Sequence, residues 1–132
     1  MIVVDASVLA NALGDDGEDG DLARERLSAD PSLHMPHLVD LEVLSVFRRR
    51  VASGDMDERR AALAIRDMQE LPFVRYPHVE FASRVWTLRR NLTPYDAAYV
   101  ALAEELALFV TADSRIGGAT GPRCKIEVLA RR

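Results

Sequence analysis

The chain has 132 residues, of which 48% are hydrophobic and 29% charged, and its 17 basic and 21 acidic residues give a net charge of −4. This length and mixed composition predict one folded domain over residues 1–132 and exclude disorder over most of the chain. A single cysteine, Cys124, excludes a disulfide framework and a cysteine-based zinc site. No apolar run can cross a bilayer and no secretory leader is visible, so we expect a cytoplasmic protein with no membrane contact, and the negative charge argues against indiscriminate binding to nucleic acid.

The first half of the chain alternates short apolar runs with helical patterns. Residues 2–4 are β-branched and continuous, which is typical of a buried strand. Glycine and acidic residues between Gly14 and Gly20 predict a loop, and Pro31 ends the helical pattern before it. In chain order we expect a strand at 2–4, a helix at 6–13, the loop, a helix at 22–29, a short strand at 34–36 and a helix at 38–52.

The second half continues this alternation. The segment from Asp55 to Glu58 resembles a capping box, and Thr93-Pro94 gives an N-cap followed by proline at the first helical position. The helix over 97–106 is apolar nearly all round, so we expect it to be enclosed. We expect a helix whose buried face is Ala61, Ala64, Ile65, Met68 and Leu71, a strand at 73–76, a helix at 79–90 with Phe81 and Trp86 in the core, the enclosed helix, and strands at 108–111 and 126–129.

Short apolar strands separated by helices predict an α/β domain, in which a short, mainly parallel sheet is sandwiched between α-helices. In such sheets, functional sites form beyond the carboxyl ends of the strands. Asp5 and Asp113 follow apolar strands directly, and Glu42 and Asp96 lie in the first turns of helices. Each has a structural alternative, because aspartates cap helices and the helix dipole favours acidic residues in a first turn.

Partly buried carboxylates that lie close together repel one another unless positive charge lies between them. The only lysine in the chain is Lys125, so a divalent cation is the better candidate for that charge. Oxygen ligands without cysteine or histidine favour Mg²⁺ or Mn²⁺ over zinc. Such an ion binds phosphate oxygens and activates water, so the pattern indicates a phosphodiester hydrolase.

Four segments of the chain resemble those of PIN-domain ribonucleases, specifically the VapC toxins of bacterial toxin–antitoxin pairs. They occur in the family's order and are Ile2-Val-Val-Asp5-Ala-Ser7, Leu38-Val-Asp-Leu-Glu42, Thr93-Pro-Tyr-Asp96-Ala-Ala-Tyr and Phe109-Val-Thr-Ala-Asp113. The resemblance implies a single PIN-like nuclease domain that cleaves RNA through a metal-activated water. It also implies a VapB-type antitoxin as partner and a homodimer.

The resemblance assigns roles to individual residues. Asp5 and Asp96 would be the firmest ligands of Mg²⁺ or Mn²⁺, Glu42 would complete the site or orient the attacking water, and Asp113 would be an outer or second-metal ligand. Ser7 and Thr111 match hydroxyl positions that hold carboxylates or waters in place. The chain departs from many members of the family after Asp113, where Ser114-Arg115 follows instead of another acidic residue.

Two other classes of function stay open at this point. One is a PIN-like RNA- or protein-binding module without catalysis. The other is a phosphatase or receiver-like domain, which is disfavoured because Asp5-Ala-Ser7 lacks a second aspartate and no lysine is suitably placed. Arginines at 48–50, 59–60, 89–90 and 131–132 are either solvated or bind phosphate, and the sequence does not select among these clusters.

Overall fold

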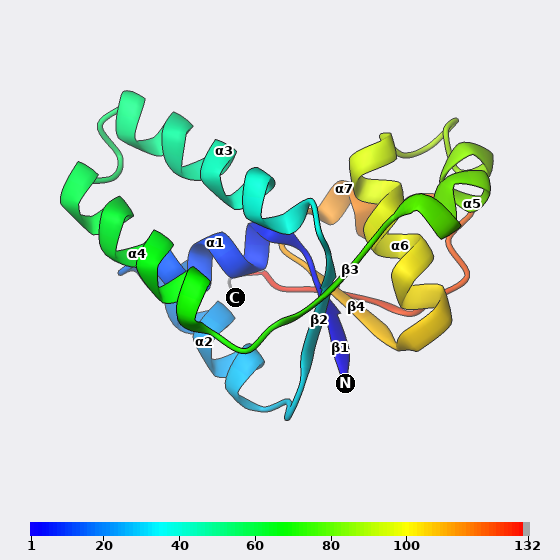
Figure 1. The fold of residues 1–132 in the computed structure, drawn as a ribbon, viewed down its shortest axis with the longest axis horizontal. Coiled ribbons are helices and arrows are strands. Elements are labelled where there is room, and N and C mark those ends of the chain that lie inside the picture. Colours follow the sequence, from blue (N-terminus) through cyan, green and yellow to red (C-terminus); the bar gives the residue numbers. More distant parts are fainter. Residues whose placement is uncertain (131–132) are drawn as a thin grey trace.

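β1 (Ile2–Val4) lies at the centre of a five-stranded sheet in a computed structural model that describes residues 1–130 (Figure 1). The strand order is β3-β2-β1-β4-β5, and every neighbouring pair is parallel. The other strands are β2 (Leu33–Pro36), β3 (Val74–Tyr76), β4 (Leu108–Thr111) and β5 (Ile126–Val128). The predicted α/β sandwich is therefore confirmed, and its sheet is parallel throughout.

Helices cover both faces of this sheet (Figure 1). One face carries α1 (Ala6–Gly14), α2 (Glu18–Ser28), α3 (Val39–Ala52) and α4 (Glu58–Glu70), and the other carries the 3₁₀ turn η1 (Val79–Phe81), α5 (Ala82–Thr87) and α6 (Pro94–Leu106). The short α7 (Ser114–Gly117) follows β4. Among residues 1–130, no helix is long and apolar enough to span a membrane.

The most enclosed helix is α6, as its composition predicts. Seven consecutive side chains from Ala97 to Ala103 are buried, and the Tyr99 ring stacks on Phe109 of β4 with centroids 5.8 Å apart. The hydroxyl of Thr93 accepts a 3.2 Å hydrogen bond from the Asp96 N–H, so the predicted N-cap is present. This cap and Pro94 fix the start of the helix, which lies at the end of the sheet where β1 and β4 finish.

Four element boundaries differ from the sequence prediction. α2 begins at Glu18, because its first turn takes up acidic residues that the helix dipole favours, so the predicted loop is shorter. The predicted helix over 79–90 is interrupted: η1 and α5 occupy 79–87, and the N–H groups of Arg89 and Asn91 bond three residues back in successive turns. The last strand stops at Val128, and Asp57, not Asp55, occupies the N-cap of α4 without a side-chain capping bond.

Two predicted core positions are wrong. Trp86 is 66% exposed, and Arg89 lies over its ring at 4.5 Å, a cation–π contact that covers one face of the indole. Leu71 is 40% exposed because α4 ends one residue earlier and the chain turns to an extended conformation there. The arginines at 131–132 lie outside the residues that the structure describes.

Candidate active site

All four predicted carboxylates line one hollow at the carboxyl edge of the sheet. Asp5 follows β1, Asp113 follows β4, Glu42 lies in the first turn of α3 and Asp96 in the first turn of α6. The hollow has a volume of about 470 Å³. Its other lining residues are Ala6, Ser7, Leu38, Leu41, Ser45, Val46, Arg49 and Tyr95. The parallel topology brings these groups together, since the strands end on the same edge.

Two hydroxyls hold the carboxylate of Asp5. Ser7 Oγ donates a 2.9 Å hydrogen bond to Asp5 Oδ2, and Thr111 Oγ1 donates one of 2.6 Å to the same oxygen. Each hydroxyl also accepts a backbone N–H: Ser7 Oγ that of Ala112 and Thr111 Oγ1 that of Asp113. Asp5 occupies the N-cap position of α1 but makes no side-chain capping bond there. Its carboxylate is held instead by the hydroxyls of Ser7 and Thr111 at the carboxyl edge of the sheet.

Burial shifts the pKa of three of the carboxyl groups upward. It raises the pKa of Asp5, which is 6% exposed, and it raises that of Glu42 to about 6, with the charges of Asp5 and Asp96 adding to the shift. Burial also raises the pKa of Asp96, and the charge of Asp113 adds to it. Burial is the main cause of each shift and the neighbouring carboxylates add to it, as in a cluster with too little positive charge.

Glu42 carries the least satisfied group of the site. Its Oε1 atom is buried and has no hydrogen-bond partner, and the buried Tyr99 hydroxyl also lacks one. The two groups affect each other's pKa, but their geometry falls short of a hydrogen bond. By contrast Asp40, two residues before Glu42, is paired with Arg75 through two bonds of 2.7 Å. A buried carboxylate oxygen without a donor is costly, and a bound cation would satisfy it.

The donor set fits a hard divalent cation, because it consists of carboxylate oxygens without thiol or imidazole. The set is not closed: among residues 1–130, no three His, Cys, Asp or Glu side chains are arranged to hold a metal ion as they stand. A cation at this edge would therefore be held by fewer than three of these side chains, with water completing its shell, unless side chains rotate.

Asp113 differs from the other three carboxylates because Arg115 engages it. Arg115 donates from Nε to Oδ1 at 3.1 Å and from Nη2 to Oδ2 at 2.8 Å, and its N–H also bonds Oδ1 at 2.9 Å. These bonds hold the pKa of Asp113 below its ordinary value, and the Oδ1 contact makes it the cap of α7. The arginine was not among the predicted site residues; the spacing Asp113-Ser-Arg115 at a helix start is the signal that marks it.

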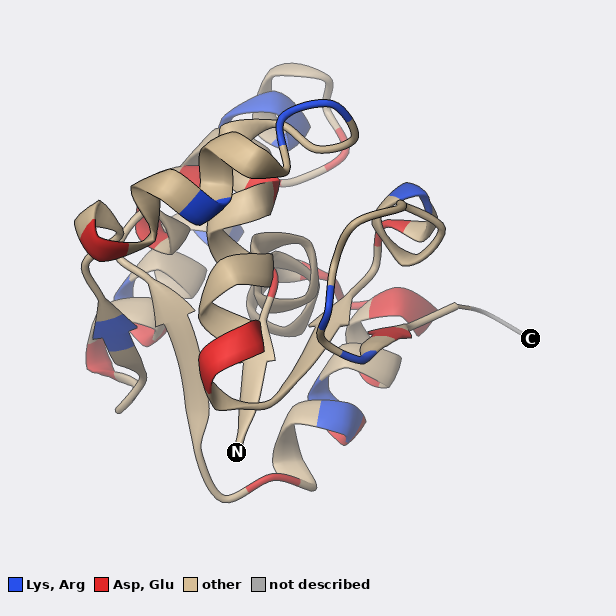
Figure 2. Cartoon of the chain, turned by 90° about the vertical axis from the view of Figure 1, so that its right-hand side faces the viewer, with Lys and Arg blue, Asp and Glu red and all other residues tan. Residues whose placement is uncertain are grey.

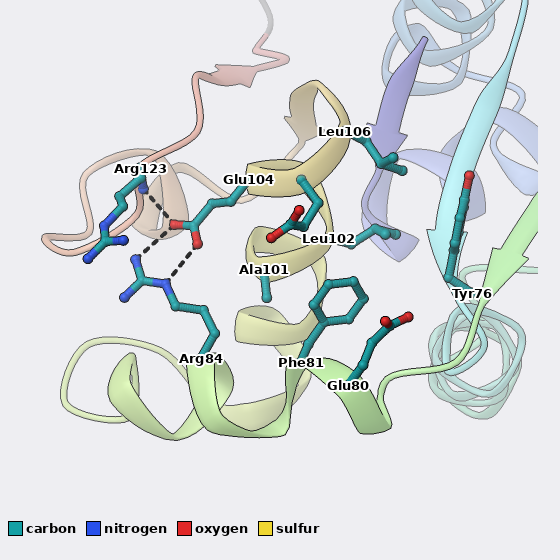
Figure 3. A pocket seen from close by; sticks show the side chains of 10 residues that line it. Tyr76, Glu80, Phe81, Arg84, Ala101, Leu102, Glu104, Leu106 and Arg123 are labelled. Atoms are coloured by element: carbon teal, nitrogen blue, oxygen red, sulfur yellow. Dashed lines mark hydrogen bonds and ion pairs between the residues drawn. The ribbon is translucent and has the colours of Figure 1, made fainter.

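A second hollow, of about 620 Å³, is lined mainly by residues of α6, η1 and α5 (Figure 3). It differs from the first in how its buried carboxylate is paired. Its central carboxylate is paired: Arg84 binds both oxygens of Glu104 at 2.7 and 2.8 Å, and the backbone N–H of Arg123 donates to Glu104 at 2.7 Å. The buried carboxylate of this hollow is therefore fully engaged. Among residues 1–130, the buried carboxylate oxygen that lacks a hydrogen-bond partner is Glu42 Oε1, in the first hollow.

Comparison with known proteins agrees with the fold. The family model of the PIN domain matches residues 2–120. The VapC ribonuclease Mb0985 of Mycobacterium bovis and ribonuclease VapC9 of Mycobacterium tuberculosis are each 44% identical to the chain, over 99% of it and 100% of their own length. Ribonuclease VapC1 of M. tuberculosis is 39% identical over 96% of both chains.

The chain therefore belongs to the PIN-domain family and, within it, to the VapC group. A solved structure with the same fold is that of M. tuberculosis VapC20, described as a Sarcin-Ricin loop cleaving toxin. It superposes with a TM-score of 0.65 at 16% identity and covers 83% of this chain and 87% of that one. The predicted family is thus confirmed, and the receiver-like alternative has no support.

Proposed function

We propose that the chain is a Mg²⁺- or Mn²⁺-dependent endoribonuclease and acts as the toxin of a VapBC-type pair. The observation that carries the proposal is the buried, partnerless Oε1 of Glu42 in a hollow shared with Asp5, Asp96 and Asp113. The relatives named as VapC ribonucleases support RNA as the substrate. A cognate VapB-type antitoxin, a homodimer and a cytoplasmic location rest on membership of the VapC group alone.

Asp5 and Asp96 are the residues we assign to hold the cation, because both face the hollow and Asp5 is fixed by Ser7 and Thr111. A bound divalent cation would neutralise the clustered carboxylates, attract the phosphate group and lower the pKa of water. We assign Glu42, which lines the same hollow, to orient the attacking water and to accept its proton. Asp113 is an outer ligand, available to the cation only when Arg115 releases it.

The test is cleavage of total RNA with and without Mg²⁺ or Mn²⁺, mapped by end sequencing. We expect Asp5→Asn and Asp96→Asn to abolish cleavage and growth inhibition while the far-ultraviolet circular dichroism stays that of the wild type. The matched control is Asp67→Asn, which makes the same change on the exposed face of α4 and leaves cleavage intact. Full toxicity of either folded site variant would overturn the proposal.

A second candidate function is a PIN-like module that binds RNA or protein without catalysis. The open ligand set and the engagement of Asp113 by Arg115 favour it. Calorimetry separates the two, because the nuclease must bind Mg²⁺ or Mn²⁺ through Asp5 and Asp96. Absence of both metal binding and RNA cleavage, together with RNA binding by the wild-type protein, would favour the module over the nuclease.

A further inference from the structure

The hollow that holds the four carboxylates is also lined by exposed residues to which no role has yet been given. Tyr95 at the start of α6 is 63% exposed, and Arg49 on α3 is exposed as well; both line the hollow. We propose that Tyr95 and Arg49 form a subsite for a single RNA strand, in which Tyr95 stacks on an unpaired base and Arg49 binds a phosphate beside the carboxylates. This inference rests on the proposed function and names residues that determine how the strand is held.

Arg49 and Glu42 lie on the same face of α3. Leu38, Glu42, Ser45, Val46 and Arg49 all line the hollow, at the spacing of one helix face. Seven residues of helix place the Arg49 backbone about 10.5 Å from that of Glu42, two turns farther from the sheet. A strand whose scissile phosphate lies at the carboxylates would thus pass a cation farther along the same wall.

The guanidinium of Arg49 is available for that contact. Its Nη1 donates a 3.1 Å hydrogen bond to the Oγ of Ser45, a residue that also lines the hollow. Within residues 1–130 it forms no ion pair with a carboxylate, whereas Arg24, Arg60, Arg75, Arg84 and Arg115 are all paired. A guanidinium without an acidic partner beside an acidic site is suited to bind phosphate.

Tyr95 presents a rigid aromatic surface next to Asp96. It lies between Pro94 and Asp96, whose N–H bonds the Thr93 hydroxyl, so its position is fixed relative to the carboxylate that follows it. In the described part of the chain its ring stacks on no other ring and lies under no guanidinium, unlike Trp86, which Arg89 covers. A free aromatic face at the edge of a nucleic-acid site is the element on which single-stranded bases stack.

The charge distribution favours this local contact over a general one. Acidic and basic residues are interspersed over the helices and loops in the view of Figure 2, and no side of one sign appears there. Leu41, which is 71% exposed, adds an apolar wall beside Tyr95 and Arg49 in the same hollow. Bases in a duplex are already stacked and paired, so apolar and aromatic walls at the site select a strand with free bases.

The experiment measures the affinity of a short, fluorescently labelled, mixed-sequence RNA by anisotropy in the Asp5→Asn background, so that cleavage does not interfere. The same RNA annealed to its complement is the second probe. We expect Tyr95→Ala to weaken single-strand binding about tenfold and Tyr95→Phe to preserve it. The control Trp86→Ala, which removes an exposed aromatic residue outside the hollow, should leave the affinity unchanged.

Salt dependence separates the two contacts. The slope of the logarithm of affinity against the logarithm of salt concentration should fall by about 0.7 in Arg49→Ala, as for one lost phosphate contact on a single strand. Arg49→Lys should keep that slope, and so should Tyr95→Ala. The control Arg48→Ala removes the same charge from the neighbouring exposed position, which does not line the hollow, and should leave the slope unchanged.

The subsite would be overturned if the site and control variants had equal effects, or if single strand and duplex bound with equal affinity. Tyr95 and Arg49 would then be candidates for contact with a protein partner. Absence of RNA binding by the parent would overturn it too. Metal-dependent cleavage by the wild-type chain is scored separately, so the subsite can fail while the proposed nuclease stands. Absence of cleavage by the wild-type chain in every metal condition would overturn the proposed nuclease, whereas the binding measurements alone decide the subsite.

Discussion

The hydroxyl of Thr111 at the end of β4 donates a 2.6 Å hydrogen bond to the carboxylate of Asp5 at the end of β1. Thr111 is fully buried and Asp5 nearly so. The same hydroxyl accepts the N–H of Asp113, so it links the first and last of the four carboxylate-bearing segments. Through this bond the position of the most buried carboxylate is set by the sheet itself.

Thr111→Val should therefore destabilise the fold and disturb the site with little change in side-chain volume. It removes the donor to Asp5 and leaves the Asp113 N–H without its acceptor, which costs about 1–3 kcal/mol in free energy of unfolding. The pKa of Asp5 should rise further, since the lost bond lowers it. Urea unfolding of the two proteins measures the difference.

The matched control is Thr111→Ser, which keeps the hydroxyl. We expect its stability to lie closer to that of the wild type than the valine variant does, and its RNA cleavage to persist. If the valine variant were as stable as the wild type and as active, the bond between Thr111 and Asp5 would have no role in positioning the site.

The elements that the sequence predicts well are those whose signal is local. The β-branched run Ile2–Val4 and the all-apolar stretch from Ala97 to Ala103 admit only buried positions, and both are buried. The helix predicted over 79–90 breaks because its apolar residues do not share one enclosed face: Val79 is 75% exposed and Trp86 66%. Periodicity alone does not reveal which helical faces the sheet covers.

The location of the four carboxylates was predictable because parallel strands end on one edge, whatever their order in the sheet. The engagement of Asp113 by Arg115 was not, since it depends on the side-chain conformation of an exposed arginine. The contribution of Tyr95 and Arg49 to the hollow depends on how α3 lies relative to α6. The roles of the carboxylates in catalysis stay a prediction.

The stability of the metal-free protein should depend on pH through Glu42. Burial raises its pKa from 4.5 to about 6, so the folded protein binds this proton more tightly than the unfolded chain does. Its stabilising contribution is complete below the unfolded pKa and is lost as the pH rises through about 6. Glu42→Gln should unfold like the wild type near pH 4 and be more stable by about 1 kcal/mol near pH 7, allowing for partial solvent screening.

The measurement is the difference in unfolding free energy between wild type and Glu42→Gln across this pH range, in buffer with a chelator. Taking the difference removes the contributions of titrating groups that do not interact with Glu42, whereas its coupling to Asp5 and Asp96 remains in it. Glu70→Gln, at the exposed end of α4, is the control and should show no pH-dependent difference. A constant offset between wild type and Glu42→Gln would contradict the buried, partnerless state of this carboxylate.

Addition of Mg²⁺ to the metal-free protein should raise its melting temperature near pH 7. A cation that binds the folded site and not the unfolded chain stabilises by about 2.7 kcal/mol at a hundred times its Kd. The effect should vanish in Asp5→Asn and Asp96→Asn and remain in Asp67→Asn. It should also fade below about pH 5, where protons compete for the carboxylates with raised pKa. An equal thermal shift in all four proteins would place the bound ion elsewhere.

Arg115→Ala should increase the affinity for Mg²⁺ severalfold, on the order of five. The guanidinium engages both oxygens of Asp113 and its charge also acts on Asp96, so its removal frees one carboxylate and takes a competing cation from the site. The pKa of Asp113 should rise toward its ordinary value, yet the group stays ionised at neutral pH.

Titration calorimetry measures the affinity for Mg²⁺, with Arg66→Ala on the exposed face of α4 as the matched control. Because the Arg115 side chain is 87% exposed, the melting temperature should not change. Unaltered Mg²⁺ affinity would show that Asp113 is a cap of α7 and not a ligand.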